Sequence, residues 1–120
     1  NGDIYHGEWV GGKREVQGTY YYGNGDLYSG SWVGDVKQGK GAYVYKSDDS
    51  QLVGEWKAGQ LDAGKWIFKD GTSWHGSFSN NRPIGRGVFY FPSGNMQAGE
   101  YVQDKAEDDE EDEDTPRKLV

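Results

Sequence analysis

The residues that could do chemistry in this chain are few, and their spacing assembles neither a catalytic site nor a metal site. Its 120 residues contain two histidines, His6 and His75, and no cysteine. A closed structural zinc site needs four ligands, mostly cysteine and histidine. Serine, histidine and aspartate are all present, yet no spacing among them places a nucleophile beside its base. We therefore expect no catalytic residue, no metal and no cofactor.

Two Gly-x-Gly runs are the second chemical candidate, because glycine-rich turns can hold a phosphate group. They are Gly39-Lys40-Gly41 and Gly85-Arg86-Gly87. A phosphate loop follows a strand and opens a helix, whereas each of these runs opens a segment of alternating residues typical of a strand. We interpret both runs as strand residues and expect no small-molecule substrate.

The charge of the chain is concentrated near its C-terminal end. The net charge is −7, and eight consecutive acidic residues run from Glu107 to Asp114. Residues 1–106 hold twelve acidic and eleven basic side chains and are nearly neutral. Without a basic face, a nucleic-acid partner is not expected. Because like charges repel, we expect residues 103–120 to form an acidic, disordered tail. The alternatives are that this run docks on a basic surface, binds cations weakly or limits non-specific association of the chain.

The strongest pattern in the chain is a glycine flanked by large side chains, repeated every 22 to 24 residues. The large residues precede and follow the glycine by two positions, which places them on one face of a strand. The glycine leaves room there for rings to lie across the backbone. The repeat core that we expect consists of Tyr5, Gly7, Trp9, Tyr28, Gly30, Trp32, Gly54, Trp56, Trp74, Gly76 and Phe78.

A second alternating segment follows each of these strands, as in Gly18, Tyr20 and Tyr22. Residues that favour positive φ separate the segments within and between units; they are Gly11-Gly12, Gly34-Asp35, Asn80-Asn81, Asn24-Gly25, Asp70-Gly71 and Ser93-Gly94. We predict an all-β protein, an elongated antiparallel meander of stacked hairpins that forms a twisted single-layer sheet. The array occupies residues 1–102, with four full units and a partial fifth, and we expect it to continue upstream.

The face opposite to the ring face carries an apolar stripe. Tyr21, Val44, Ile67 and Tyr90 recur at the outward position of successive second strands. An apolar stripe on an open sheet face often marks a protein contact, so these four are the candidate partner-binding residues. The alternative is that they are ordinary strand-forming residues on a solvated surface. The sequence leaves open which face binds a partner.

The segments YHGEWVGGKREVQGTYYYGNGD and YSGSWVGDVKQGKGAYVYKSDD resemble MORN repeats, whose pattern is Tyr-x-Gly-x-Trp followed by glycines on the return strand. The resemblance covers about residues 2–102 and departs at Leu52 and Gln97, where the leading tyrosine is absent. Within the family, residues 76–114 are similar to MORN-repeat proteins of the radial spoke head of cilia and flagella.

That resemblance implies a non-enzymatic scaffold of the ciliary or flagellar axoneme that supports motility. The partners it implies are other radial spoke head proteins and a second copy of the chain. Other members of the family imply an alternative, a phospholipid-binding or adaptor module. Attraction to anionic lipid takes a cluster of four to eight basic residues, and the richest cluster here is Lys13-Arg14. A membrane partner is therefore not expected.

Overall fold

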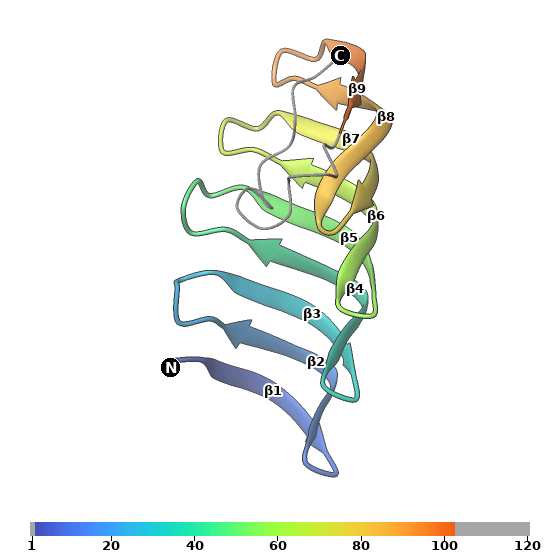
Figure 1. Cartoon of the computed structure of the whole chain (residues 1–120). Coiled ribbons are helices and arrows are strands. Elements are labelled where there is room, and N and C mark those ends of the chain that lie inside the picture. The colour runs from blue at the N-terminus through green and yellow to red at the C-terminus, as the bar shows by residue number, and fades with distance from the viewer. Residues whose placement is uncertain (1, 103–120) are drawn as a thin grey trace.

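In a computed structural model of the chain, which describes residues 2–102, nine antiparallel strands form one sheet in chain order. Figure 1 shows the strands following one another from the N-terminus to the C-terminus. They are β1 (Ile4–Val10), β2 (Lys13–Tyr21), β3 (Leu27–Val33), β4 (Val36–Val44), β5 (Gln51–Lys57), β6 (Gln60–Ile67), β7 (Ser73–Ser79), β8 (Arg82–Tyr90) and β9 (Met96–Tyr101). The predicted all-β, single-layer meander is confirmed. The predicted acidic tail, residues 103–120, lies outside the described residues.

Two kinds of turn connect the strands. The turns inside the units have two residues, both with positive φ, as at Gly34 (55°) and Asp35 (72°), which is the geometry of a type I′ hairpin. The turn between β2 and β3 instead has one left-handed glycine, Gly25 (φ 100°), whose N–H donates to the Tyr22 carbonyl at 3.0 Å. Ala58 (φ 52°) also takes a left-handed conformation that its residue type does not predict.

The glycines form one continuous row across the sheet. Paired in register, they are Gly7, Gly18, Gly30, Gly41, Gly54, Gly64, Gly76, Gly87 and Gly99, one from each strand. The Tyr28 ring lies over this row, and its hydroxyl donates to the Ser31 carbonyl at 3.1 Å. A Cβ at Gly41 would stand 2.2 Å from the Tyr28 Oη. Because the glycines have no side chains, the row leaves the space against the backbone in which the rings lie.

The rings form the hydrophobic core on one face of the sheet, here called the aromatic face. Its buried members are Tyr28, Trp32, Leu52, Trp56, Leu61, Trp74, Phe78, Phe89 and Tyr101. Trp32 and Trp56 each contact a ring of the preceding unit: Trp32 lies 5.6 Å from Tyr5 and Trp56 lies 5.2 Å from Tyr28. Their indole N–H groups donate to the carbonyls of Gly18 and Gly41.

Trp9 is a correction to the expected repeat core, because its side chain is 56% exposed. Its ring contacts Tyr5 at 5.0 Å. The rings that cover Trp32 and Trp56 come from the unit before each of them, and β1 is the first strand that the structure describes. Trp9 therefore shares the face of the core but is not buried in it.

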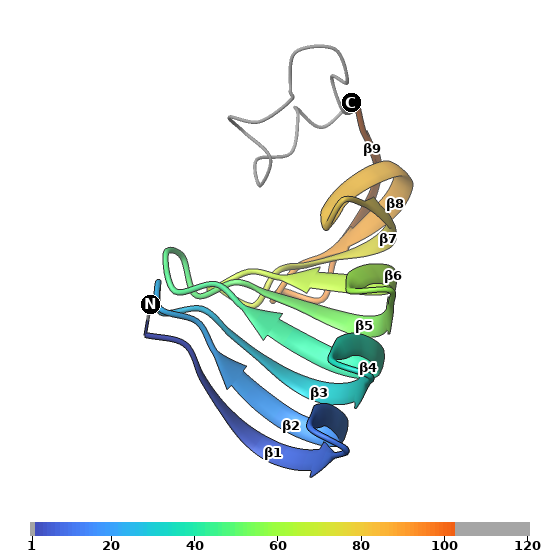
Figure 2. The same cartoon turned by 60° about the horizontal axis from the view of Figure 1, so that its bottom comes forward.

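The strands bend toward the aromatic face. Lys37 and Tyr43 are six residues apart on β4, which is about 20 Å along a flat strand, yet the Lys37 Nζ lies 6.0 Å from the Tyr43 ring. The register of every hairpin shifts just beyond the glycine row, as it does between Gly30 and Trp32. The hairpin turns consequently curl over one side of the sheet in Figures 1 and 2. The aromatic face is concave, and the opposite, outer face is convex.

We predict that Val16→Gly stabilises the protein. Val16 is 54% exposed and has φ 66°, a conformation that β-branched residues rarely adopt. It pairs with Trp32, and glycine occupies the corresponding places opposite Trp56 (Gly39) and Tyr101 (Gly85). Relief of a strain of about 1–2 kcal/mol exceeds the entropic cost of glycine. The free energy of unfolding should therefore rise by about 0.5–1 kcal/mol, as measured by urea unfolding that is monitored by tryptophan fluorescence.

The matched control is Val10→Gly, which removes another exposed valine, at the end of β1, where no positive φ occurs. This control should lose stability, because glycine weakens a strand. Equal effects of the two substitutions would contradict the assignment of strain to Val16.

We predict that Gly41→Ala destabilises the protein by about 1–3 kcal/mol, the usual cost of overpacking. The added methyl group would collide with the Tyr28 hydroxyl and displace that ring from the glycine row. Chemical denaturation measures the loss. Lys40→Ala, at the exposed neighbouring position on the outer face, should change stability by less than about 0.5 kcal/mol. A stable Gly41→Ala variant would show that the row does not limit the packing of the rings.

Candidate interaction surfaces

The outer face carries a continuous row of side chains, one from each strand, here called the outer row. Its members, in register, are Ile4, Tyr21, Leu27, Val44, Gln51, Ile67, Ser73, Tyr90 and Met96. All four candidate partner-binding residues lie in it. Ile4 and Met96 are 54% and 65% exposed, Tyr21 and Tyr90 are 43% and 40% exposed, and Val44 and Ile67 are partly exposed. Seven of the nine side chains are apolar, so the stripe is longer than the four residues predicted.

The first strands contribute apolar residues to the outer row that the sequence reasoning missed. Ile4, Leu27 and Met96 each lie three residues before a glycine of the repeat. That spacing was available as a signal, but Gln51 and Ser73 occupy the same place in the other two units and obscure it. The residues from the first strands and those from the second strands form one row because of the strand pairing, in which Tyr21 lies opposite both Ile4 and Leu27.

The two histidines lie beside the tyrosines of the outer row. His6 contacts Tyr21 with ring centroids 5.8 Å apart, and His75 contacts Tyr90 at 4.6 Å, both edge to face. Burial and the nearby charge of Lys65 lower the pKa of His75, so its ring is neutral at pH 7. Among residues 2–102, no three histidine, aspartate or glutamate side chains are grouped to hold a metal ion.

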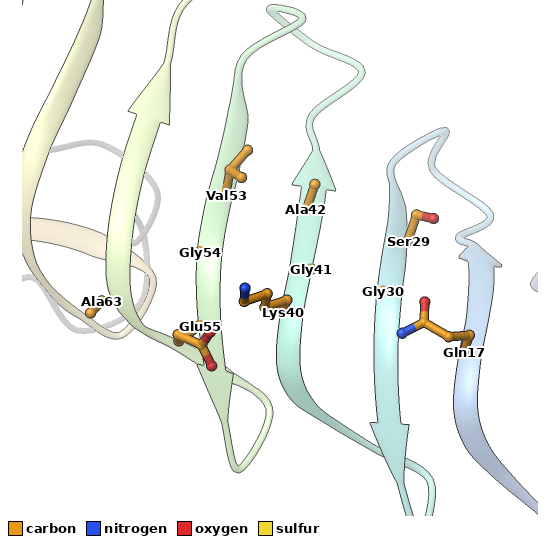
Figure 3. Close-up of a pocket in the computed structure, with 10 residues that line it drawn as sticks. All are labelled: Gln17, Ser29, Gly30, Lys40, Gly41, Ala42, Val53, Gly54, Glu55 and Ala63. Carbon is orange, nitrogen blue, oxygen red and sulfur yellow. The ribbon is translucent and has the colours of Figure 1, made fainter.

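A shallow groove of about 470 Å³ crosses the outer face over β2 to β6. Figure 3 shows the backbone of Gly30, Gly41 and Gly54 between its two lines of side chains. Lys40 and Glu55 lie opposite each other on β4 and β5. One basic and one acidic side chain among small residues form no set of donors directed at a single ligand atom, so this groove suits side chains of a protein surface.

Basic and apolar side chains of the chain itself cover much of the aromatic face. The Arg14 guanidinium lies over Trp32 at 4.9 Å and Tyr20 at 5.0 Å, and the Lys37 ammonium lies over Tyr28 at 5.6 Å. The corresponding residues of the third and fourth units pair with Trp56 and Phe78 and are apolar; they are Leu61 and Pro83. These covering side chains could not be predicted from the repeat pattern, because the bend of the strands brings them onto the rings.

Hydrogen bonds between units hold this arrangement at both ends of the strands. At the turns between units, Asp3 accepts from the Tyr20 hydroxyl at 2.8 Å, and Asp26 accepts from the Tyr43 hydroxyl at 2.8 Å. At the hairpin tips, Asp35 Oδ1 accepts from the Arg14 N–H at 2.8 Å and from its Nε at 2.9 Å. These bonds lower the pKa of Asp35.

Rings and cations occupy much of the aromatic face, whereas much of the outer row is exposed. The outer row is therefore the better candidate for contact with a partner protein. The structure brings Tyr21, Val44, Ile67 and Tyr90 into one line, and their role in binding remains a prediction. No helix long and apolar enough to cross a bilayer occurs in residues 2–102.

Comparison with known proteins agrees with this architecture. A family model described as the MORN repeat matches residues 5–27, 28–50 and 74–96. The chain is also 36% identical over 66 residues to a protein of Cyprinus carpio named "Radial spoke head 1 homolog". The match covers 52% of this chain and spans 30% of the length of that relative. The unit around Leu52, where the leading tyrosine is absent, lies outside the three matched repeats.

We predict that the hairpin tips weaken in acid. The pKa of Asp35 lies below its ordinary value of 3.8, so its stabilising contribution is present above that pH and is lost as the pH falls through the lowered pKa. Asp35→Asn should lower the midpoint of thermal unfolding at pH 5–7, and its difference from the parent chain should shrink below about pH 4. Differential scanning calorimetry measures both quantities.

Asp62→Asn is the control, since Asp62 is exposed and joins neither of the two ion pairs among residues 2–102. This variant should follow the parent chain at each pH. A constant difference between the parent chain and Asp35→Asn down to pH 2 would contradict an ionic contribution of Asp35.

Proposed function

Because the chain belongs to the family of MORN-repeat proteins, we propose that it is a scaffold of the axonemal radial spoke head. In this role it binds other radial spoke head proteins and supports the motility of cilia and flagella. The similarity to the carp radial spoke head homologue supports the location. The observation that carries the scaffold role is the outer row, which has one side chain on each of the nine strands, seven of them apolar and several of them exposed.

The two faces of the sheet give the proposed scaffold its mechanical and binding properties. Rings and cations cover much of the concave face. Their contacts join neighbouring strands and should make the sheet rigid, as in the contacts of Trp32 with Tyr5 and Arg14. The outer face has no second layer over it among the described residues, so its side chains are available to another protein. Across nine strands spaced by about 4.8 Å, the outer row extends for roughly 38 Å. That length is enough for an interface of ordinary size.

The composition of the outer row fits a protein partner. Tyrosine and methionine are enriched in protein interfaces, and charged residues are depleted in the centre of such interfaces. Tyr21, Tyr90 and Met96 supply the first two types, and no member of the row is charged. The partners we propose are other radial spoke head proteins or a second copy of this chain. The proposed role is not enzymatic.

We propose that two parts of the chain have different roles. Residues 1–102 are the repeat array and act as the scaffold, while residues 103–120 contain the acidic run. The nearly neutral array and the acidic segment differ so strongly in charge that they suit different partners. The array offers an apolar line, and the acidic segment offers only charge.

We predict that three substitutions in the outer row weaken assembly without unfolding the sheet. Tyr21→Thr, Ile67→Thr and Tyr90→Thr place a β-branched residue that favours strands at each position but remove the large apolar surface. In cells that lack the protein, the variant chain should recover radial spoke head proteins from axonemal extracts about tenfold less well than the parent chain. Quantitative mass spectrometry of affinity-purified complexes measures the recovery.

The control changes the same face outside the outer row. Lys40→Ser with Glu55→Ser leaves the net charge unchanged and should co-purify with the same proteins as the parent chain. Urea unfolding of all three chains checks that the sheet is intact. Undiminished recovery by the triple variant would refute the outer row as the contact surface.

A further inference from the structure

Two neighbouring hairpin tips of the sheet share the same backbone contacts but differ at the turn position that Asp35 occupies in the first. The turn of the second hairpin joins the first through the Asp35 N–H, which donates to the Arg14 carbonyl at 3.1 Å. The turn of the third hairpin joins the second in the same way, through the Gly59 N–H and the Lys37 carbonyl, also at 3.1 Å. Asp35 and Gly59 occupy the same turn position, and both have positive φ.

The basic side chains of the two tips also correspond. Arg14 lies over Tyr5, Tyr20 and Trp32 and forms an ion pair with Asp35 at 2.9 Å. Lys37 lies over three rings at 5.6 to 6.0 Å, namely Tyr22, Tyr28 and Tyr43. Because glycine stands where the first tip has aspartate, the second tip supplies no carboxylate to its cation.

Lys37 lacks an ionic partner in the part of the chain that the structure describes. The two ion pairs formed there are Arg14–Asp35 and Lys69–Asp49. Asp26 lies nearby, but its Oδ2 accepts from the Tyr43 hydroxyl at 2.8 Å and its Oδ1 from the Lys46 N–H at 2.9 Å. Burial and the charge of Arg14 lower the pKa of Lys37, which means that both disfavour its charged form. A bound anion beside the ammonium group would stabilise that charged form.

A cavity of about 340 Å³ opens beside this cation on the aromatic face. Its lining includes the rings of Tyr22, Tyr43 and Trp56 and the amides of Asn24 and Asn81. Burial raises the pKa of Tyr22 to about 12, so its hydroxyl remains a hydrogen-bond donor. The cavity thus combines a cation and a neutral donor with flat aromatic walls. The one carboxylate in its lining, Asp26, is held by the Tyr43 hydroxyl and the Lys46 N–H.

We propose that this cavity, here called the Lys37 slot, binds a carboxylate side chain of an acidic peptide segment. The Lys37 ammonium pairs with the carboxylate, and the rings of Tyr22, Tyr43 and Trp56 flank the methylene groups of the bound residue. The ion pair between Arg14 and Asp35 at the neighbouring tip is an example, within this chain, of the contact that we propose between Lys37 and a bound carboxylate. This site lies on the opposite face from the outer row and does not depend on the proposed scaffold function.

A carboxylate fits the slot better than a phosphate group does. A phosphate carries more charge and is usually held by several basic groups or backbone N–H groups, whereas the slot has one lysine among its lining residues. The acidic segment has two possible sources, a partner protein or the chain's own run from Glu107 to Asp114. Both sources present the same chemistry, and experiment can separate them.

The test uses the full chain and a hexaglutamate peptide as the probe, with hexaglutamine as the uncharged reference. Isothermal titration gives the affinity, and NMR of the labelled chain locates the contact. We expect shifts of the side-chain resonances of Tyr22, Tyr43 and Trp56, and no binding of hexaglutamine. Lys37→Gln should weaken hexaglutamate binding about tenfold or more, the effect of losing one charge-assisted hydrogen bond.

Matched variants separate the slot from general charge attraction. Lys13→Gln removes an exposed cation with the same change in net charge and should leave the affinity within about twofold of the parent chain. Gly59→Asp restores the missing carboxylate in a turn where a Cβ meets no atom within 4 Å. This variant should occupy Lys37 from within, abolish peptide binding and raise the thermal midpoint above that of Gly59→Asn.

A further variant replaces the eight acids of residues 107–114 with their amides. Tighter binding of hexaglutamate to this variant supports the slot and identifies the run as a competitor within the chain. Unchanged binding also supports the slot and assigns its natural occupant to a partner.

Three results would overturn the proposal. In the first, hexaglutamate binds Lys37→Gln as tightly as the parent chain. In the second, Gly59→Asp and Gly59→Asn bind it equally. In the third, inorganic phosphate or vesicles containing phosphatidylserine displace hexaglutamate and bind more tightly in a Lys37-dependent manner, which would make the slot a site for phosphate or lipid headgroups.

Discussion

The whole structure depends on how closely the rings approach the glycine row. A side chain at Gly18 or Gly41 would occupy the space of the Tyr5 or Tyr28 ring, so the aromatic face can exist only where the backbone has no Cβ. With the rings laid flat, one sheet can bury large apolar surfaces without a second layer. The row therefore replaces the second sheet or the helices that usually cover an open β-sheet.

The bend of the strands follows from the same constraint. Register shifts beyond the glycine row turn the hairpin tips toward the rings, and this curvature brings Arg14 and Lys37 onto aromatic rings that a flat strand would hold far away. Consequently the aromatic face is largely self-contained, whereas the outer face keeps its apolar row exposed. The difference between a largely covered concave face and an exposed convex face supports a scaffold that contacts its structural partners through the convex face.

The units repeat the same backbone but differ in chemistry along the array. In the first two units, aspartates accept hydrogen bonds from tyrosine hydroxyls, as between Asp26 and Tyr43. In the later units, Trp66 and Phe89 take the places of these tyrosines, and Leu61 takes the place of Lys37. In these later units, apolar side chains thus stand where the first units have hydrogen-bonded tyrosines and a covering cation. The Lys37 slot lies at this change, where a cation of the second unit adjoins a hairpin tip that lacks aspartate.

The sequence by itself determined the period, the strands, most of the turns and the face on which the rings lie. These features are local, because alternation along a strand and residues that favour positive φ act within a few positions. It also pointed to Tyr21, Val44, Ile67 and Tyr90 on the other face. Only the tertiary structure decided that Trp9 is exposed, that Arg14 pairs with Asp35 and that Lys37 has no such partner within residues 2–102. Those outcomes depend on the curvature of the sheet and on contacts between units about twenty residues apart, which no local pattern specifies.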